Sequence, residues 1–581
     1  MKKKITTSTP NTRRAMATSA FSIDVQLGAG DTLSPSGDAF AAVSSMYAPK
    51  IKLTAAAAPA PDASAPDMIA VLVREDDIHK TETPLSGSTL NTIDESMQGL
   101  LSEAVGLADF TGSVASLASA RTPPSGFTGA KHVALVGTGK DSTTSASAVA
   151  MYKVGMATAK EAKRVRVKSL EVRFLEGVCT SACALAGFAR GLVVGGYDDS
   201  RFKSSSGEEA REKKRSKLES VCVVIAPQDQ MELPAVEAAL KHGAGSANGV
   251  LLAKQLVGAP ANVVTPTALA HTAMAIAASN SSTMKATILE KDDCEKLGMG
   301  LYLGVSACAS EPPKFIHLVY TPPGVDAAAA EALPQVGIVG KGLTFDSGGY
   351  NIKAGAGSMI DMMKFDMGGS AATLGAAAAV AALEPEGVCA HFIVASCENM
   401  VSSVGMRPGD ILKASNGKTV EVNNTDAEGR LTLADALVYA QTKAKVETVI
   451  DIATLTGACM VALGPHVAGM YSSTDAMAAA VAKSAEDAGE KMWRMPLEQG
   501  YFEQLKSSYA DMKNTGTRYG GSITAALFLK EFVNEGVSWA HVDMAGPVWD
   551  SKADCASGYG AATLADFVCS YPASRKDLGK E

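Results

Sequence analysis

Four acidic residues and two lysines in the C-terminal half have types and spacings that suit metal-assisted chemistry. They lie in three short segments: VGIVGKGLTFDSGGYNIK at 336–353, MMKFDMGG at 362–369 and NTDAEGRL at 424–431. The acids are Asp346, Asp366, Asp426 and Glu428, and the lysines are Lys341 and Lys353. A lysine inside an apolar strand is costly unless it is paired or bound. Carboxylates held close together repel one another unless cations neutralise them.

A set of oxygen ligands without histidine suits Mg²⁺ or Mn²⁺, and Zn²⁺ also accepts it. Shared carboxylates would hold two such ions about 3.5–4 Å apart, as in two-metal hydrolases. The ions would lower the pKa of a shared water and polarise a carbonyl, and a nearby lysine and arginine would stabilise the resulting oxyanion. The residues therefore predict a dimetal hydrolase, and they leave peptide, phosphate-ester and amide substrates open.

Each segment also has a simpler interpretation. Lys341 and Asp346 could form one salt bridge, Asp366 could be only the N-cap of the helix that follows it, and the third segment could be a solvated surface turn. Against the last interpretation, Asp426, Glu428 and Arg430 alternate with small residues. In an extended segment alternate side chains point the same way, so we expect the two carboxylates and the guanidinium to converge on one side.

The elements that must position these residues belong to two α/β domains of unequal size. Residues 67–230 are expected to form a smaller N-terminal domain, 231–258 a connecting helix, and 259–575 a larger catalytic domain around a central mixed, mainly parallel sheet. In such sheets ligand sites gather where strands end and helices begin, which is where the three segments lie. Residues 1–66 are expected to be a disordered or targeting segment that ends in an Ala/Pro-rich linker at 54–66.

Apolar runs and their periodicity predict the elements in more detail. In the first half, strands are expected at 69–73, 132–136, 165–167 and 221–225, and helices at 91–104, 146–163, 182–192 and 232–257. In the second half, strands are expected at 315–320, 335–345, 390–395, 419–422 and 446–454, and helices at 368–383, 432–443 and 522–533.

Composition excludes several classes of protein. The net charge of −8 gives no basic field for phosphates, which makes nucleic acid an unlikely partner. No stretch is long and apolar enough to predict a membrane span. The ten cysteines contain no CxxC pair, so free or buried thiols are expected rather than a disulfide framework. The first 23 residues are basic and rich in Ser and Thr, which fits either an organelle transit peptide or a disordered tail.

The three segments together resemble the leucine aminopeptidase family of cytosolic type, and in detail its plant and algal branch. Further segments agree: APAN with TP at 259–266, DIATLTG at 451–457, DMKNTGTRYGGSITAA at 511–526 and HVDMAGP at 541–547. The similarity spans roughly residues 250–570, whereas the N-terminal half resembles the family only in layout. NTDAEGRL is the most specific of these motifs.

The resemblance implies a role for each matching residue. Asp346 and Glu428 would touch both metal ions, Asp426 would complete one site, and Lys341 and Asp366 the other. Lys353 and Arg430 match the two catalytic residues: Arg430 would hold a bicarbonate that acts as general base, and Lys353 would bind substrate and stabilise the gem-diolate. Met363, Thr454, Leu455 and Gly457 resemble the wall of the substrate pocket. The cofactors implied are two divalent ions per subunit, Zn²⁺ or Mn²⁺ and possibly Mg²⁺.

The resemblance also implies a function and its setting. The chain is expected to remove N-terminal residues, preferably Leu or Met, from short peptides, to assemble as a homohexamer and to reside in the chloroplast or otherwise the cytoplasm. Rival interpretations are a phosphoesterase or dipeptidase that uses the same metals, a chaperone or DNA-binding role beside catalysis, and a purely structural assembly protein.

Overall fold

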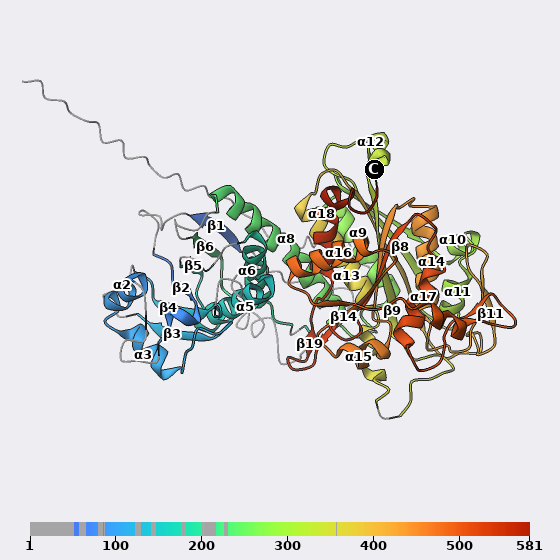
Figure 1. Ribbon diagram of the computed structural model, residues 1–581, viewed down its shortest axis with the longest axis horizontal. Coiled ribbons are helices and arrows are strands. Elements are labelled where there is room, and N and C mark those ends of the chain that lie inside the picture. The colour runs from blue at the N-terminus through green and yellow to red at the C-terminus, as the bar shows by residue number, and fades with distance from the viewer. Residues whose placement is uncertain are drawn as a thin grey trace, which may run out of the picture.

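The computed structural model forms two lobes joined by one long helix (Figure 1). It describes residues 51–56, 65–79, 85, 88–122, 129–140, 147–175, 178, 181–199, 201–202, 216–225, 231–355 and 357–580. Each lobe is a sheet covered by helices, which confirms the predicted α/β class with a smaller N-terminal and a larger C-terminal unit. The proposed transit peptide at 1–23 lies outside the described residues.

The N-terminal lobe contains a six-stranded sheet in the order β1-β6-β5-β2-β4-β3, and only the β3–β4 pair is antiparallel. The central strand β2 is a continuous apolar run that is buried along its whole length, as a strand covered on both faces should be. The strands are β1 (Lys52–Ala56), β2 (Met68–Val73), β3 (Leu117–Arg121), β4 (His132–Gly137), β5 (Ser169–Phe174) and β6 (Ser220–Ile225). The helices are α2 (Ser88–Ser96), α3 (Leu100–Leu107), α5 (Ala148–Val165) and α6 (Ala182–Gly195).

Three expectations for this lobe were wrong in part. Residues 52–56 are not a disordered segment: they form β1, because Ile51 and Leu53 bury their side chains while the backbone pairs with β6. No strand lies at 165–167, since α5 continues to Val165, ends at Arg166 in the left-handed conformation, and leads into β5. The helix expected at 91–104 is broken at Gly99, whose φ of +81° a helix does not allow.

Helix α8 (Leu233–Gly258) connects the lobes and packs against α6 on one side and α13 (Gly368–Leu383) on the other. Small residues let these backbones approach closely: a Cβ on Gly249 of α8 would lie 2.2 Å from the carbonyl oxygen of Gly375 of α13. One described segment, 360–383, is apolar and long enough by composition to cross a membrane, but 83% of its window is buried inside the protein. We therefore assign it to the core.

The C-terminal lobe is built on a mixed eight-stranded sheet in the order β15-β14-β17-β13-β9-β10-β8-β7. Its four consecutive strands β17, β13, β9 and β10 run parallel, so their carboxyl ends meet at one edge. The strands are β7 (Met284–Leu289), β8 (Lys314–Tyr320), β9 (Gln335–Asp346), β10 (Cys389–Asn399), β13 (Thr448–Ala453), β14 (Ala468–Ser472), β15 (Met492–Arg494) and β17 (Ser538–Asp543).

Helices cover both faces of this sheet (Figure 1). They are α9 (Pro266–Ser279), α10 (Lys291–Lys296), α11 (Gly300–Ser306), α12 (Ala327–Ala332), α13, α14 (Gly429–Thr442), α15 (Gly457–Leu463), α16 (Asp475–Ala488), α17 (Gly521–Lys530) and α18 (Ala561–Ser574). The strand expected at 419–422 is β12 (Thr419–Glu421), which belongs to a separate small sheet with β11 (Ile411–Lys413) and β16 (Met512–Lys513). Of the ten cysteines, the nine in the described part are free.

Candidate active site

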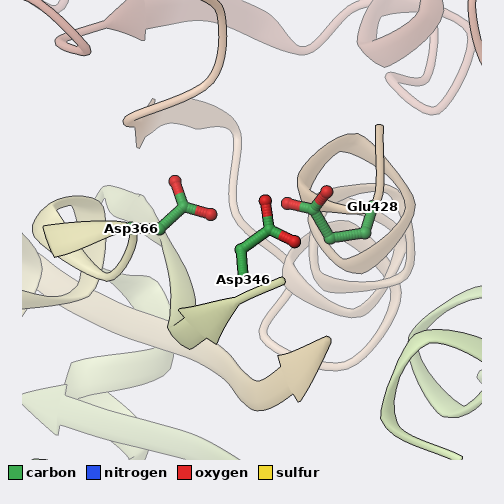
Figure 2. A group of neighbouring side chains, drawn as sticks. All are labelled: Asp346, Asp366 and Glu428. Carbon is green, nitrogen blue, oxygen red and sulfur yellow. The ribbon is translucent and has the colours of Figure 1, made fainter. Parts of the chain in front are cut away.

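The three chemistry-bearing segments meet at the carboxyl edge of the parallel strands. Asp346 is the last residue of β9, Asp366 follows the short helix η2 (Ile360–Phe365), and Glu428 directly precedes α14. Ligand atoms of these three carboxylates lie within 4.8 Å of one another, and all three residues are buried. Figure 2 shows the carboxylates turned toward one another, with Asp346 between the other two.

Lys341, in the middle of β9, pairs with two of these acids. Its Nζ lies 2.7 Å from Asp366 Oδ2 and 3.0 Å from Glu428 Oε1, and it donates a hydrogen bond to the carbonyl oxygen of Thr454 at 3.1 Å. The Lys341 side chain is only 3% exposed. A buried ammonium group therefore has three oxygen partners.

Lys353 pairs with Asp346 and with the fourth acid, Asp426. Its Nζ lies 2.9 Å from Asp346 Oδ2 and 2.5 Å from Asp426 Oδ1. Asp426 is the most exposed acid of the group, with 31% of its side chain accessible. The four acids thus form one continuous cluster that is closed at its inner end by Lys341 and partly open at Asp426.

The charges of this cluster do not balance. Four carboxylates face two ammonium groups, so two negative charges remain when every group is ionised. Burial, together with the charge of Asp346, raises the pKa of Glu428 to about 8, and burial raises the pKa of Asp366 to about 6 although Lys341 opposes the shift. Burial and Asp346 likewise raise the pKa of Asp426. The site therefore favours any added cation, including a proton.

The pKa values of the two lysines are also raised, which for a lysine favours the charged form. Burial alone would lower the pKa of Lys341, but the charges of Asp366, Glu428 and Asp346 outweigh it and raise that pKa above its usual value. Asp346, Glu428 and Asp426 overcome burial and raise the pKa of Lys353 in the same way. Both lysines are therefore ammonium ions wherever the carboxylates alone surround them.

Two glycines make the close approach of these segments sterically feasible. A Cβ on Gly429 would lie 2.4 Å from Lys341 Cε and 2.7 Å from its Nζ, so a larger residue there would have to displace the buried lysine side chain from α14. Gly348 has φ of +87°, and a Cβ there would lie 2.8 Å from Asp426 Oδ1. The glycines of these motifs are thus part of the geometry of the site.

The simpler interpretations of the first two segments were wrong. The ion pairs of Lys341 are with Asp366 and Glu428, and Asp346 pairs instead with Lys353. Asp366 does not cap the helix behind it, because Met367 is the N-cap of α13 and the Asp366 carboxylate is used by Lys341 and by the Thr454 hydroxyl, 3.0 Å away.

The expected extended conformation at 424–431 was also wrong. Residues 425–426 form a turn, Glu428 is already in the helical region, and α14 begins at Gly429. Asp426 and Glu428 reach the cluster because the chain turns between them, not because alternate side chains of a strand share a face. The Arg430 side chain lies in the first turn of α14, where its Nη1 donates to the carbonyl oxygen of Asn514 at 2.9 Å.

Arg430 is buried and incompletely paired. It is 7% exposed, and its Nε has no hydrogen-bond partner within the part of the chain that the structure describes. Burial lowers the pKa of Arg430 to about 10, while Glu428 and Asp543 favour the charged form. A buried guanidinium with a spare donor is suited to binding a small anion or a developing negative charge.

Of the four pocket residues that the resemblance implies, Met363 and Thr454 contact residues of the cluster. Met363 lies in η2, and its carbonyl oxygen accepts a hydrogen bond from the Asp366 amide at 3.2 Å. Thr454 contacts both Lys341 and Asp366, Leu455 is half-buried, and Gly457 is exposed with open space where a Cβ would be. Thr454 and Met363 therefore contact the cluster directly, and Leu455 and Gly457 follow Thr454 in the chain.

Sequence reasoning missed two asparagines that organise the site. Asn399, the last residue of β10, donates to Asp346 Oδ1 at 2.8 Å and to the Thr425 carbonyl at 3.0 Å. Asn514 accepts from the amides of Asn423 and Asn424 and donates to the carbonyl oxygens of Asn424 and Ala427. The position of Asn399 at a strand end was an available signal, whereas Asn514 carried none without the fold.

Comparisons with known proteins match both lobes. A family model described as the cytosol aminopeptidase family, catalytic domain, matches residues 251–565, and that family's N-terminal domain matches residues 70–206. The chain is 49% identical over 507 residues to leucine aminopeptidase 2, chloroplastic, of Oryza sativa subsp. japonica, which covers 86% of this chain and 81% of the relative. It is 47% identical over 513 residues to leucine aminopeptidase 2, chloroplastic, of Arabidopsis thaliana, with 87% and 84% covered.

A solved structure agrees with these matches. The structure of a lysine-to-glutamate variant of tomato leucine aminopeptidase superimposes with a TM-score of 0.78 at 43% sequence identity. The superposition covers 90% of this chain and 97% of the tomato chain. The likeness therefore extends over both lobes rather than the catalytic lobe alone.

Proposed function

The chain belongs to the cytosol aminopeptidase family and is a leucyl aminopeptidase-type hydrolase, and from that premise we propose that its carboxylate cluster holds two divalent metal ions for peptide hydrolysis. The observation that carries the proposal is the excess of carboxylate over ammonium charge among the buried Asp346, Asp366 and Glu428 and the half-buried Asp426. Glu428 Oε2 is buried without a hydrogen-bond partner among the described residues, which leaves a free carboxylate oxygen for a cation.

The donor set fits divalent ions in kind and number. Asp346 and Glu428 would be shared by the two ions, Asp426 would serve the outer ion, and Asp366 with Lys341 the inner one. Lys341 would ligate as a neutral amine, since a neighbouring dication reverses the effect that the carboxylates have on its pKa. Bound ions of this kind lower the pKa of water and polarise a carbonyl. Family membership supports divalent ions, and we propose Zn²⁺ or Mn²⁺, with Mg²⁺ as the third candidate.

Lys353 and Arg430 are the proposed catalytic residues. Lys353 reaches the cluster from the open side near Asp426, where an entering peptide would meet it. Once cations satisfy Asp346 and Asp426, its ammonium group is free to donate to the substrate carbonyl and to the negative oxygen that forms there. Arg430 has a buried donor to hold bicarbonate, which would accept the proton of the attacking water.

Selectivity would come from the side chains beside the cluster. We propose that Met363, Thr454, Leu455 and Gly457 line the pocket for the first residue and favour Leu or Met. The preference should be loose, because one methylene changes selectivity by only about 1–3 kcal/mol. The substrates would be short peptides with a free N-terminus.

The proposed setting is a homohexamer in the chloroplast. The nearest support for location is the word chloroplastic in the names of the rice and Arabidopsis relatives. The support for assembly is family membership, together with exposed apolar side chains such as Val404, Val461 and Tyr519, which are 70%, 90% and 75% exposed. A gel-filtration mass equal to one subunit would refute the assembly.

The test of the function uses chelated protein re-supplied with Mn²⁺, Zn²⁺ or Mg²⁺. We expect turnover of Leu-p-nitroanilide to vanish on chelation and to return with metal, and an Asp426→Asn variant to recover poorly. N-acetyl-Leu-p-nitroanilide and p-nitrophenyl phosphate are the matched controls, and neither should be hydrolysed at a comparable rate. Turnover that survives chelation, or equal hydrolysis of the phosphate ester, would overturn the proposal.

A further inference from the structure

The carboxylate of Asp543 is not among the proposed metal ligands, yet it is buried and accepts four hydrogen bonds. Asp543 is the last residue of β17, it pairs in parallel register with Ala453 of β13, and it is 0% exposed. Its oxygens accept hydrogen bonds from the amides of Leu455, Thr456 and Ala545 at 3.2, 3.4 and 3.2 Å, and from the Thr456 hydroxyl at 2.6 Å. Such a carboxylate fixes the backbone that follows β13.

The loop that Asp543 holds touches the inner end of the carboxylate cluster. Thr454 directly precedes the two amides bound by Asp543, and its carbonyl oxygen accepts from Lys341 Nζ at 3.1 Å. Its hydroxyl donates to Asp366 Oδ1 at 3.0 Å. Thr454 is 4% exposed, so these contacts are made away from water. One loop residue thus orients two of the proposed ligands at once.

We propose that Asp543 is a positioning residue: by clamping residues 455 and 456 it holds Thr454 against Lys341 and Asp366 and thereby sets the affinity of the inner metal position. The inference rests on the proposed metal centre and extends it to a carboxylate that binds no metal itself. Partners that orient metal ligands typically change affinity 10–100-fold when they are removed.

The hydrogen bonds between Asp543 and residues 455 and 456 can also be altered at Thr456. Besides donating to Asp543, the Thr456 hydroxyl accepts from the Cys459 amide at 3.0 Å and so caps α15. Serine at 456 would keep both hydrogen bonds, whereas valine would keep the shape and lose both. This pair of variants alters the clamp without removing a buried carboxylate.

Asp451 offers a matched control. It lies on the neighbouring strand β13, is also 0% exposed, and accepts from Trp539 Nε1 at 2.7 Å and pairs with His541 Nδ1 at 2.5 Å. None of these contacts involves residues 454–456. Its replacement by asparagine therefore disturbs an equally buried carboxylate of the same sheet while leaving the clamp intact.

The experiment measures Mn²⁺ affinity of the full-length, chelator-stripped protein by competition with a chromophoric chelator, together with kcat and KM for Leu-p-nitroanilide at saturating Mn²⁺. We expect D543N and T456V to bind the tighter equivalent of Mn²⁺ at least tenfold more weakly, with kcat reduced and KM within about twofold of wild type. T456S and D451N should bind Mn²⁺ as the unmodified protein does.

Wild-type affinity in D543N and T456V would overturn the inference, and so would equal weakening in D451N, which would indicate general loosening of the sheet. If D543N fails to fold, the comparison of T456V with T456S decides. Absence of Mn²⁺ binding and of turnover in the unmodified protein would instead refute the proposed function, so the two failures are distinguishable.

Discussion

The Nζ of Lys341 lies 2.7 Å from Asp366 Oδ2. Both side chains are buried, with 3% of Lys341 and 5% of Asp366 exposed. The lysine comes from the middle of a strand, and the aspartate from the end of a short helix 25 residues later. Their contact joins the end of η2 to the middle of β9. It also keeps the inner end of the carboxylate cluster assembled before any cation binds.

Replacing Lys341 by methionine should therefore destabilise the metal-free protein. Two buried carboxylates would lose their counter-charge, and breaking a buried ion pair typically costs about 3–5 kcal/mol. Urea unfolding of chelator-treated protein measures the loss. Lys353→Met is the comparison, since its side chain is 15% exposed and water can take its place, so its loss should be smaller. Equal stability of K341M and the unmodified protein would contradict the role of the pair.

Gly429→Ala should impair metal binding without removing any ligand. The added methyl group would press on Lys341 Cε and Nζ at 2.4 and 2.7 Å, and the lysine and the start of α14 would have to separate. We expect a loss of at least tenfold in turnover and a lower metal content by elemental analysis. Gly106→Ala is the control, because an added Cβ there meets nothing within 4 Å and alanine favours the helix α3. A G429A variant as active and metal-rich as G106A would show that the close approach is dispensable.

Metal affinity should fall as the solution becomes acidic. In the metal-free cluster the pKa of Glu428 is raised to about 8 and that of Asp366 to about 6, so protons compete for the same oxygens. Affinity should decrease steadily between about pH 9 and pH 6, and binding should release protons near pH 7. Calorimetry in buffers of different ionisation enthalpy counts those protons, and a count of zero with pH-independent affinity would contradict the shifts.

The same shift makes an opposite prediction for stability without metal. A carboxyl whose pKa is higher in the folded than in the unfolded state is protonated only in the folded state at pH values between the two. Raising the pH through this range therefore favours the unfolded state. The metal-free protein should therefore lose stability as pH rises from about 4.5, the ordinary value for Glu428, through about 8. Unfolding curves across this range, with and without Mn²⁺, should diverge as pH increases. Stability that rises with pH in the metal-free protein would count against the raised pKa of Glu428.

Arg430→Ala should reduce kcat more than KM. The guanidinium is proposed to hold the bicarbonate that accepts a proton, so its loss should reduce kcat by about 10²-fold while metal content stays constant. In bicarbonate-free buffer the unmodified protein should slow and recover when bicarbonate is added, whereas R430A should not respond. Arg430→Lys keeps the charge but not the planar donor set, and should recover only in part. A bicarbonate response in R430A as large as that of the unmodified protein would exclude this role.

The sequence predicted the elements nearest the site best, for a physical reason. Helix α13 was predicted at its observed bounds, since its run of small residues starts at a Gly pair and ends before Glu384 and Pro385. Strands β9 and β13 were predicted at 335–345 and 446–454 from their apolar runs and lie at Gln335–Asp346 and Thr448–Ala453. In contrast, β1 was not predicted, because the sequence around it is rich in Ala and Pro. Its pairing with β6, about 170 residues away, cannot be predicted from the local sequence.

For the site, residue types predicted a carboxylate cluster but not its internal pairing. Which acid each lysine contacts depends on how β9, η2 and the start of α14 converge, and this is a property of the fold. The extended interpretation of 424–431 failed because Gly429 starts a helix against Lys341, a contact that periodicity does not encode. The roles of Asn514 and Asp543 could not be predicted for the same reason, because each contacts a segment far from it in sequence. Asn399 had one signal, its position at a strand end, but its contact with Asp346 depends on the fold.

The most direct test of the central claim is the number of divalent ions bound per chain. Elemental analysis of protein dialysed against Mn²⁺ or Zn²⁺, combined with anomalous diffraction at the metal edge, should give two ions per chain among Asp346, Asp366, Asp426 and Glu428. A Glu428→Gln variant, which changes a shared ligand, should lose at least one of them together with most of its turnover. Full turnover with fewer than two ions per chain, or ions bound away from these four carboxylates, would contradict the account.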